Sequence, residues 1–252
     1  MTIDYPETCR YVSLWQLWQE AFQDDDTFLN GFFRTAFSPL RCRCALREDR
    51  VAGALYWLDC VCGGQKLAYL YAVATHPDFR GQGVCRALMA DAHALLAARG
   101  YDGVLLVPDG ERLRGMYAAM GYQEVTALSE FVCAAGADPV AMHAIDVEEY
   151  ARCRRELLPP DSVLQEGESL RFLDSYAQFY TGLGFLLAAR PEGELLRGLE
   201  ILGDPEAAPG ILRTLGFSQG IFRAPGAKQP FAMFRPLTPD AECPAYFAFA
   251  FD

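Results

Sequence analysis

The sequence predicts a mixed α/β protein built from two similar halves. Strand-like stretches form a meander before residue 75, helices alternate with short apolar strands after it, and a similar order returns later in the chain. A meander followed by strand–helix–strand connections gives a sheet with both antiparallel and parallel pairs, so the fold class is α/β with a mixed, α+β-like sheet. The chain has 252 residues, enough for two domains of ordinary size. Gly-Ala-Asp-Pro at residues 136–139 has the composition of a linker, so we expect domains at residues 1–136 and 137–252.

Composition and charge narrow the function classes. The net charge is −11, which argues against nucleic acid as a partner and is compatible with a cationic small substrate. No uncharged apolar run approaches the roughly 20 residues that span a membrane, and the first residues lack an apolar leader. We therefore expect a cytoplasmic protein with no membrane partner. The nine cysteines of such a chain are expected to be reduced thiols.

The first half predicts two helices, a three-stranded meander, and then helix, strand, helix and a pair of strands. Helical spacing of apolar residues, glycine caps and alternating patterns place these elements. The expected helices are residues 11–22, 28–37, 84–99 and 111–120, and the expected strands are residues 41–47, 51–62, 67–75, 103–107, 123–125 and 130–134.

Two Cys-x-Cys pairs, Cys42 with Cys44 and Cys60 with Cys62, could suggest a metal site. The first pair alternates with arginines, as in a strand whose cysteines face inward. A turn at residues 48–50 would pair it with residues near 55–57, several positions short of Cys60. We expect buried thiols and no metal.

The stretch Arg80-Gly81-Gln82-Gly83 separates a strand-like run from a helix-like run. Glycines ahead of a helix allow close approach of a ligand, and the N–H groups of the first helical turn can bind an anion. Arg80 adds a positive charge. From these residues alone, a phosphate-binding loop and an ordinary strand–turn–helix connection both remain open.

The element order and the run Ala74-Thr75-His76-Pro77-Asp78-Phe79-Arg80-Gly81-Gln82-Gly83-Val84 resemble the GNAT superfamily of N-acetyltransferases. The family's pyrophosphate loop follows Arg/Gln-x-x-Gly-x-Gly/Ala, which Arg80 and Gly83 match, whereas Cys85 departs from it in the last position. A second match is the helical run 113–122, which ends in Gly-aromatic and carries Tyr117 on the family's tyrosine position. The resemblance covers residues 10–135.

The resemblance implies that acetyl-CoA is the acetyl donor, with its pyrophosphate held by the loop and its pantetheine arm by backbone groups at Val73 and Ala74. It also implies that Tyr117 donates a proton to the departing thiolate. A phenol with a pKa near ~10 can serve a thiol with a pKa near ~8.5. The implied cofactor-binding residues are Val73, Ala74, Thr75, Arg80, Gly81, Gln82, Gly83, Val84 and Cys85.

No general base is visible, because the strand at residues 67–75 carries no Glu. A water chain, Tyr69, Tyr71, Asp59 and the C-terminal carboxylate at Asp252 are the candidates. Asp109 could contact the cofactor or cap the helix that follows it. The three histidines are too dispersed for a metal site or a catalytic triad.

The second half repeats the order of helices, hairpin and helix, so we expect a reduced copy of the same fold; an unrelated α+β domain is the alternative. Gly203-Asp204-Pro205-Glu206 stands where the loop would be, and its carboxylates would repel an anion. The expected helices are residues 147–158, 170–183 and 211–215, and the expected strands are residues 140–145, 185–189, 195–202, 231–234 and 246–251.

The sequence thus predicts an N-acetyltransferase with one active site per chain, acting on a primary amine of a small molecule or peptide by direct attack. A non-catalytic acyl-CoA-binding or regulatory module is the competing hypothesis. A dinucleotide-binding enzyme is disfavoured because Gly-x-Gly-x-x-Gly is absent. The acceptor is not visible in the sequence, and a homodimer is compatible with it.

Overall fold

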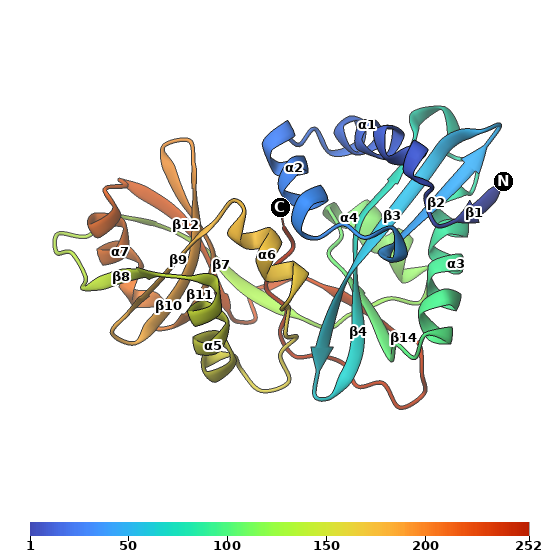
Figure 1. The fold of residues 1–252 in the computed structure, drawn as a ribbon. Helices are drawn as coiled ribbons and strands as arrows, with labels where there is room; N and C mark the ends of the chain where they lie inside the picture. The colour runs from blue at the N-terminus through green and yellow to red at the C-terminus, as the bar shows by residue number, and fades with distance from the viewer. Residues whose placement is uncertain (252) are drawn as a thin grey trace.

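The computed structural model describes residues 1–251 and contains two seven-stranded mixed sheets, side by side in Figure 1. The predicted α/β class is confirmed. The first sheet has the order β1 (Thr2–Asp4), β2 (Cys42–Arg47), β3 (Arg50–Cys62), β4 (Gln65–Thr75), β5 (Gly103–Leu106), β14 (Met233–Pro236) and β6 (Gln123–Glu124). The second has the order β13 (Gln229–Pro230), β7 (Ala127–Ala134), β12 (Gln219–Pro225), β11 (Leu195–Gly203), β10 (Phe185–Glu192), β9 (Gln178–Gly182) and β8 (Met142–Ile145).

Helices cover both faces of the first sheet because its strands are apolar on both sides. Along β3, Leu55 and Trp57 pack with the core under α3, whereas Tyr56 and Leu58 pack with the core under α1 and α2. This alternation is the period of two expected for a strand. The helices are α1 (Tyr11–Phe22), α2 (Asp26–Thr35), α3 (Val84–Ala98), α4 (Gly110–Ala118), α5 (Val147–Leu157), α6 (Glu168–Asp174) and α7 (Ala208–Leu215).

The two sheets match position by position. In each, two helices separate the first strand from the second, a meander follows, and one parallel pair is present, β4 with β5 and β11 with β12. The helix α7 occupies the connection that α3 occupies in the first sheet, but no helix corresponding to α4 lies between β12 and β13. The predicted reduced copy is therefore confirmed.

The sheets exchange one strand each. The sixth position of the first sheet is filled by β14, which pairs with β5 and β6, and the sixth position of the second is filled by β7, which pairs with β12 and β13. Figure 1 shows β7 running from one half to the other. The boundary predicted between residues 136 and 137 falls between β7 and β8, two strands of the same sheet. The second sheet is therefore built from the continuous segment 127–230, whereas the first combines residues 2–124 with the distant β14.

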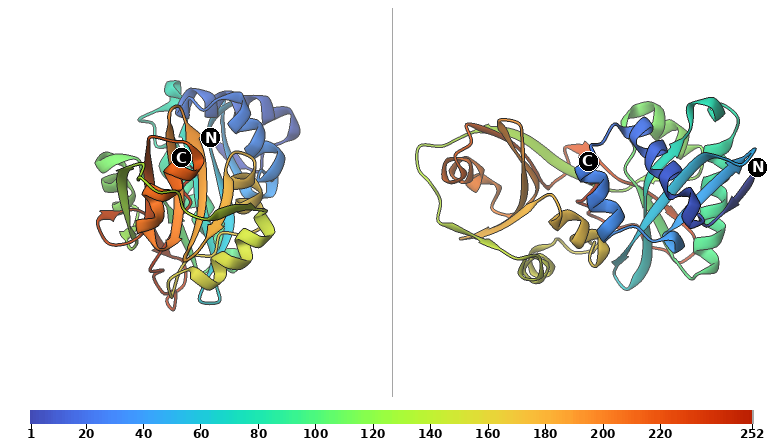
Figure 2. Two further views of the ribbon diagram at one scale, coloured as in Figure 1. Left: turned by 90° about the vertical axis from the view of Figure 1, so that its left-hand side faces the viewer. Right: turned by 45° about the horizontal axis from the view of Figure 1, so that its top comes forward.

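A continuous core joins the halves. The ring of Phe172 on α6 lies 5.0 Å from that of Phe28 and 5.4 Å from that of Phe32, both on α2. The chain end at Tyr246–Phe251 is buried in the same core. Figure 1 and the right-hand view of Figure 2 show the C-terminus between the two halves. The second half therefore packs against α2, on the face of the first sheet that α1 and α2 cover.

Three element predictions were wrong. The helix expected at residues 170–183 ends at Asp174, and Gln178 begins β9, which pairs with β8 and β10; sheet pairing outweighs the helix-like aromatic spacing. The strands expected at 123–125 and 130–134 do not pair, because they lie in different sheets. Residues 246–251 form no strand, and their phenylalanines and alanines are both buried.

Across residues 1–251, no helix combines the length and the apolar character needed to cross a membrane. The four cysteines of the two Cys-x-Cys pairs are buried, with Cys42 opposite Tyr56 and Cys44 opposite Ala54. The pairing of Cys42 with Tyr56 agrees with the predicted pairing near residues 55–57.

Candidate active site

The loop Arg80-Gly81-Gln82-Gly83 is exposed and leads directly into α3. Gly81 has φ 72° and Gly83 has φ 79°, left-handed values that favour glycine, and an added Cβ at either would meet no atom within 4 Å. Gly83 is the N-cap of α3, so no N-cap side chain bonds the N–H groups of the first helical turn. Arg80 Nε donates to the Thr75 carbonyl at 3.3 Å, which holds the guanidinium beside the loop. Backbone N–H groups at a helix start beside a guanidinium can bind an anion.

The strand β4 is bulged just before this loop. Tyr71 pairs with Tyr56 and Ala74 with Ala54, so β4 has one extra residue between these pairs. Ala72 in the bulge has φ 48°, a left-handed conformation that is uncommon for a residue with a Cβ and that concentrates at functional sites.

Beyond the bulge, β4 and β5 separate. Their parallel pairing ends at Tyr69 with Leu105, and within the described chain no strand pairs with β4 on this side over Val73–Thr75. The separated strands expose backbone N–H and C=O groups between the loop and the middle of the sheet. An extended ligand with amide groups can pair with such an edge as an added strand does.

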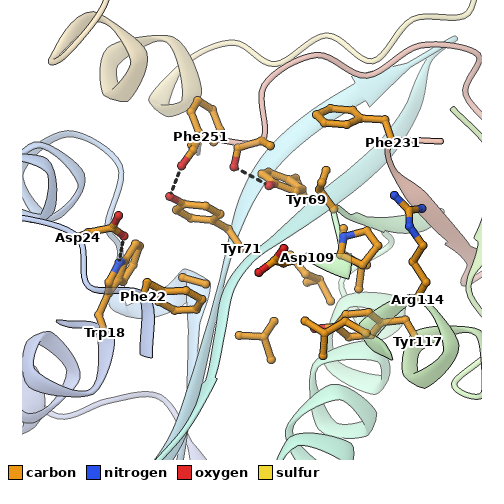
Figure 3. A pocket seen from close by; sticks show the side chains of 18 residues that line it. Trp18, Phe22, Asp24, Tyr69, Tyr71, Asp109, Arg114, Tyr117, Phe231 and Phe251 are labelled. Carbon is orange, nitrogen blue, oxygen red and sulfur yellow. Dashed lines mark hydrogen bonds between the residues drawn. The ribbon is translucent and has the colours of Figure 1, made fainter. Parts of the chain in front are cut away.

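A cavity of about 560 Å³ opens where the two strands separate (Figure 3). Its lining comes from β4, the β5–α4 connection, the end of α1, α4 and the chain end. The main side chains are Trp18, Phe22, Asp24, Tyr69, Tyr71, Asp109, Leu113, Arg114, Tyr117, Phe231 and Phe251.

Tyr117 lies on α4 at the floor of this cavity in Figure 3 and is 6% exposed. Its hydroxyl has no hydrogen-bond partner within residues 1–251. Burial, reinforced by the neighbouring Cys85 thiol, raises the pKa of Tyr117, so the phenol stays protonated near neutral pH. A protonated phenol with no internal partner can donate to a group in the cavity.

A second tyrosine stands behind the first. The Tyr122 ring lies 5.8 Å from that of Tyr117, edge to face, and its hydroxyl is 2.7 Å from His93 Nε2. Burial lowers the pKa of His93 to about 4, so the imidazole is neutral near pH 7. Cys85 packs against the same cluster, and burial raises the pKa of its thiol. A protonated thiol is a poor nucleophile.

Asp24 is a site residue that the sequence analysis missed. It lines the cavity from the α1–α2 connection and accepts a hydrogen bond from Trp18 Nε1 at 2.8 Å (Figure 3). Burial raises the pKa of Asp24. The run Asp24-Asp25-Asp26-Thr27 has the composition of a helix start, but only Asp25 caps α2, by accepting from Phe28 N at 2.8 Å. The available sequence signal was the number of acids: three precede or begin α2, although one is enough to cap it.

The candidates for a general base are placed differently. Tyr69 and Tyr71 line the cavity, but each donates to the chain end at 2.8 Å, to the carbonyls of Ala250 and Phe251 respectively. Asp59 does not line the cavity; it accepts from the Tyr101 hydroxyl at 2.5 Å. Asp252 lies outside the described residues.

Asp109 occupies the N-cap position of α4 without a side-chain capping hydrogen bond and lines the cavity instead. Residues 1–251 contain no group of three or more His, Cys, Asp or Glu side chains arranged to hold a metal ion. Val73 and Tyr117 line the cavity, whereas residues 80–85 do not; the loop follows the end of β4 at Thr75.

Comparisons with known proteins agree with this geometry. A family model described as an acetyltransferase (GNAT) domain matches residues 6–125. The fold is similar to a GCN5-related N-acetyltransferase from Kribbella flavida, with TM-score 0.70, 15% identity and coverage of 94% of this chain and 72% of that chain. The corresponding protein from Anabaena variabilis gives TM-score 0.71, 15% identity and coverage of 94% and 73%.

A tandem GNAT protein from the clavulanic acid biosynthesis pathway aligns over 95% of this chain and 100% of its own, with TM-score 0.58 and 13% identity. At these identities the solved structures establish the fold, including its tandem arrangement, and the family model adds acyl transfer at the level of the family. Residues 6–125 match the acetyltransferase (GNAT) domain family, and the chain as a whole shares the tandem GNAT fold of these solved structures.

Proposed function

We propose that this protein is an acetyl-CoA-dependent N-acetyltransferase that acetylates a primary amine of a small molecule or peptide within a ternary complex. One observation supports this proposal above the others. The separation of β4 from β5 beyond Tyr69 leaves an open edge of β4, which lines the cavity containing Tyr117 at Val73 and ends at Thr75, five residues before Arg80 of the loop.

The cofactor would lie along this edge. The pyrophosphate would accept from the N–H groups at the start of α3, around Val84 and Cys85, with the Arg80 guanidinium beside it. The amides of the pantetheine arm would pair with backbone groups at Val73–Thr75. The thioester would then reach the cavity near Tyr117.

Transfer would proceed by direct attack. The amine nitrogen forms a bond to the thioester carbonyl carbon, and the resulting tetrahedral intermediate breaks its carbon–sulfur bond. The thiolate of CoA takes the proton of the Tyr117 hydroxyl as it leaves, and the proton that the amine nitrogen releases passes through water to the Tyr117 phenolate, which restores the phenol. A covalent route through Cys85 is disfavoured because burial keeps its thiol protonated.

The acceptor would enter on the α1–α2 side of the cavity. Within residues 1–251, Asp24 and Asp109 are the carboxylates that line the cavity, and aromatic rings of Trp18, Phe22 and Phe251 line it as well. A carboxylate beside aromatic faces suits a cationic amine with an apolar body. The net charge of −11 would attract such a substrate.

The test is a pair of measurements on the full chain. Calorimetric titration with CoA and acetyl-CoA should give saturable binding that Arg80→Ala weakens and that Arg213→Ala, an exposed charge change on α7, leaves unaltered. Thiol release from acetyl-CoA should then depend on an added amine. Binding without release across a broad amine panel would support the non-catalytic acyl-CoA-binding module, and no binding at all would contradict both functions.

A further inference from the structure

The chain end forms part of the cavity wall although it belongs to no sheet. Tyr246–Phe251 runs between the two halves, and each of its residues is at most 6% exposed. Ala250 and Phe251 line the cavity, with the Phe251 ring on the side of Asp24 in Figure 3. A segment without regular structure that is this deeply buried must have its backbone polar groups bonded elsewhere.

A short connector of the second half supplies part of this bonding. Residues 161–165 lie between β3 and the chain end. On one side, Leu164 exchanges both backbone hydrogen bonds with Val61 of β3, at 2.8 and 3.2 Å. On the other side, Val163 N donates to the Tyr246 carbonyl at 2.8 Å, and Ala245 N donates to the Asp161 carbonyl at 2.8 Å.

Gln165 completes the contact with its side chain. Its amide nitrogen donates to the Phe249 carbonyl at 2.8 Å, and its amide oxygen accepts from Phe249 N at 2.9 Å. The side chain therefore reproduces the donor and acceptor pair of a neighbouring strand. Gln165 is fully buried, so no water can replace either bond.

A buried charge pair of the second half also contacts this segment. Arg154 on α5 and Glu200 on β11 form a bidentate pair at 2.6 and 3.0 Å. The Tyr246 hydroxyl lies 3.3 Å from Glu200, and the Arg154 guanidinium lies 4.6 Å from the Phe249 ring centroid. These groups fix the start and the middle of the segment.

The first half fixes its far part. Tyr69 and Tyr71 of β4 donate to the carbonyls of Ala250 and Phe251. Phe251 has φ 59°, so its ring direction depends on a left-handed backbone that the contacts on both sides must hold. Gln165 bonds Phe249, two positions before Phe251.

We infer that Gln165 is a positioning residue of the acceptor site: it fixes the backbone of Phe249 and thereby the Phe251 wall against which the amine substrate binds. The inference rests on the proposed function, and it gives the reduced second half a role. That half has no loop of its own and instead holds the wall of the single active site.

The experiment compares Gln165→Glu with Gln219→Glu, the same chemical change at an exposed position of β12. A carboxylate at residue 165 keeps an acceptor for Phe249 N but cannot donate to the Phe249 carbonyl. Hydrogen–deuterium exchange on the full chain should show faster exchange at residues 246–251 in Gln165→Glu and no change in Gln219→Glu. Unchanged exchange in Gln165→Glu would overturn the contact itself, whatever the activity.

Steady-state kinetics with an acceptor amine and acetyl-CoA provides the second readout. Gln165→Glu should raise KM for the amine about 10-fold, the effect of losing one good interaction, while KM for acetyl-CoA and the affinity for CoA remain within about twofold. Gln165→Asn retains both functional groups on a shorter stem, so its amide cannot reach as far. Its KM for the amine should therefore stay above that of the wild-type enzyme. Faster exchange with an unchanged KM for the amine, or an equal rise in both KM values, would overturn the positioning role.

The two proposals fail separately. A wild-type protein that binds CoA but transfers no acetyl group contradicts the proposed function, and the exchange experiment still tests the contact of Gln165. A transferase in which Gln165→Glu behaves like Gln219→Glu contradicts the inference alone.

Discussion

Replacing Tyr117 with Phe removes one hydroxyl from the cavity. That hydroxyl has no hydrogen-bond partner within residues 1–251, and the ring is 6% exposed. Because no internal bond is lost and the apolar area is retained, the free energy of unfolding should change by less than about 1 kcal/mol. The phenol is proposed to protonate the leaving thiolate, and general acids contribute ~10²–10⁴-fold. We therefore expect kcat to fall by that factor, about 3–5 kcal/mol in the activation free energy.

Tyr122→Phe is the matched control. It removes a hydroxyl from the neighbouring ring, but this one bonds His93 Nε2 at 2.7 Å, and both groups are buried. Its loss should lower stability by about 1–3 kcal/mol because a buried nitrogen loses its partner. That corresponds to a fall in Tm of about 2–12 °C for a chain of this size, with kcat within about threefold. The two substitutions should thus have opposite profiles of stability and activity.

Three measurements distinguish the outcomes: the kinetics of CoA release, titration with CoA and thermal unfolding. Each is made on the wild-type protein, Tyr117→Phe and Tyr122→Phe. Because burial raises the pKa of Tyr117, the wild-type enzyme should keep its acid through mildly alkaline pH. A Tyr117→Phe enzyme with kcat within threefold of wild type would refute the acid role. A loss of kcat matched by an equal loss of CoA affinity would assign Tyr117 to cofactor binding instead.

Three further changes test other parts of the site. Gly83→Ala places a Cβ at φ 79°, where no atom lies within 4 Å, so it should cost about 1–2 kcal/mol of stability and also weaken CoA binding in calorimetry. Gly100→Ala, at φ 73° in equally open space beyond α3, should show only the stability cost; equal CoA affinity in both would contradict the role of the loop. Asp24→Asn should raise KM for a cationic amine about 10-fold and leave KM for acetyl-CoA unchanged, and an unaltered amine KM would remove Asp24 from the acceptor site. Burial lowers the pKa of His93 to about 4, so stability from this group is complete above pH ~6.5 and is lost as the pH falls toward 4; urea unfolding should show about 2 kcal/mol less stability at pH 5 than at pH 7, and His93→Gln should lack most of this difference.

The glycine turn ahead of α3 and the helix that carries Tyr117 could be predicted because each is a local pattern, whereas their roles stay predictions that rest on the family resemblance. Two glycines with left-handed backbones followed by a helix leave a short signature, and Tyr117 lies one helical element later with its Gly-aromatic end. The hairpin around residues 48 and 49 and the Cys42 pairing follow from local alternation in the same way. None of these depends on what the second half does.

The strand exchange and the acceptor wall could not be predicted this way because they depend on pairings between distant residues. The β14 strand joins β5 across more than a hundred residues, and no local pattern marks it as belonging to the first sheet. Phe251 and Asp24 reach the cavity only because the chain end and the α1–α2 connection converge there. Gln165 has no sequence signal at all, since its role depends on the backbone of Phe249.

The central claim is that an amine attacks acetyl-CoA directly in this cavity. Initial rates of CoA release, measured while both the amine and acetyl-CoA are varied, test it most directly. The account predicts amine-dependent release with intersecting double-reciprocal lines and no acetylated enzyme by mass spectrometry. Parallel lines with an acetyl group on Cys85, or no amine-dependent release from protein that binds CoA, would contradict it.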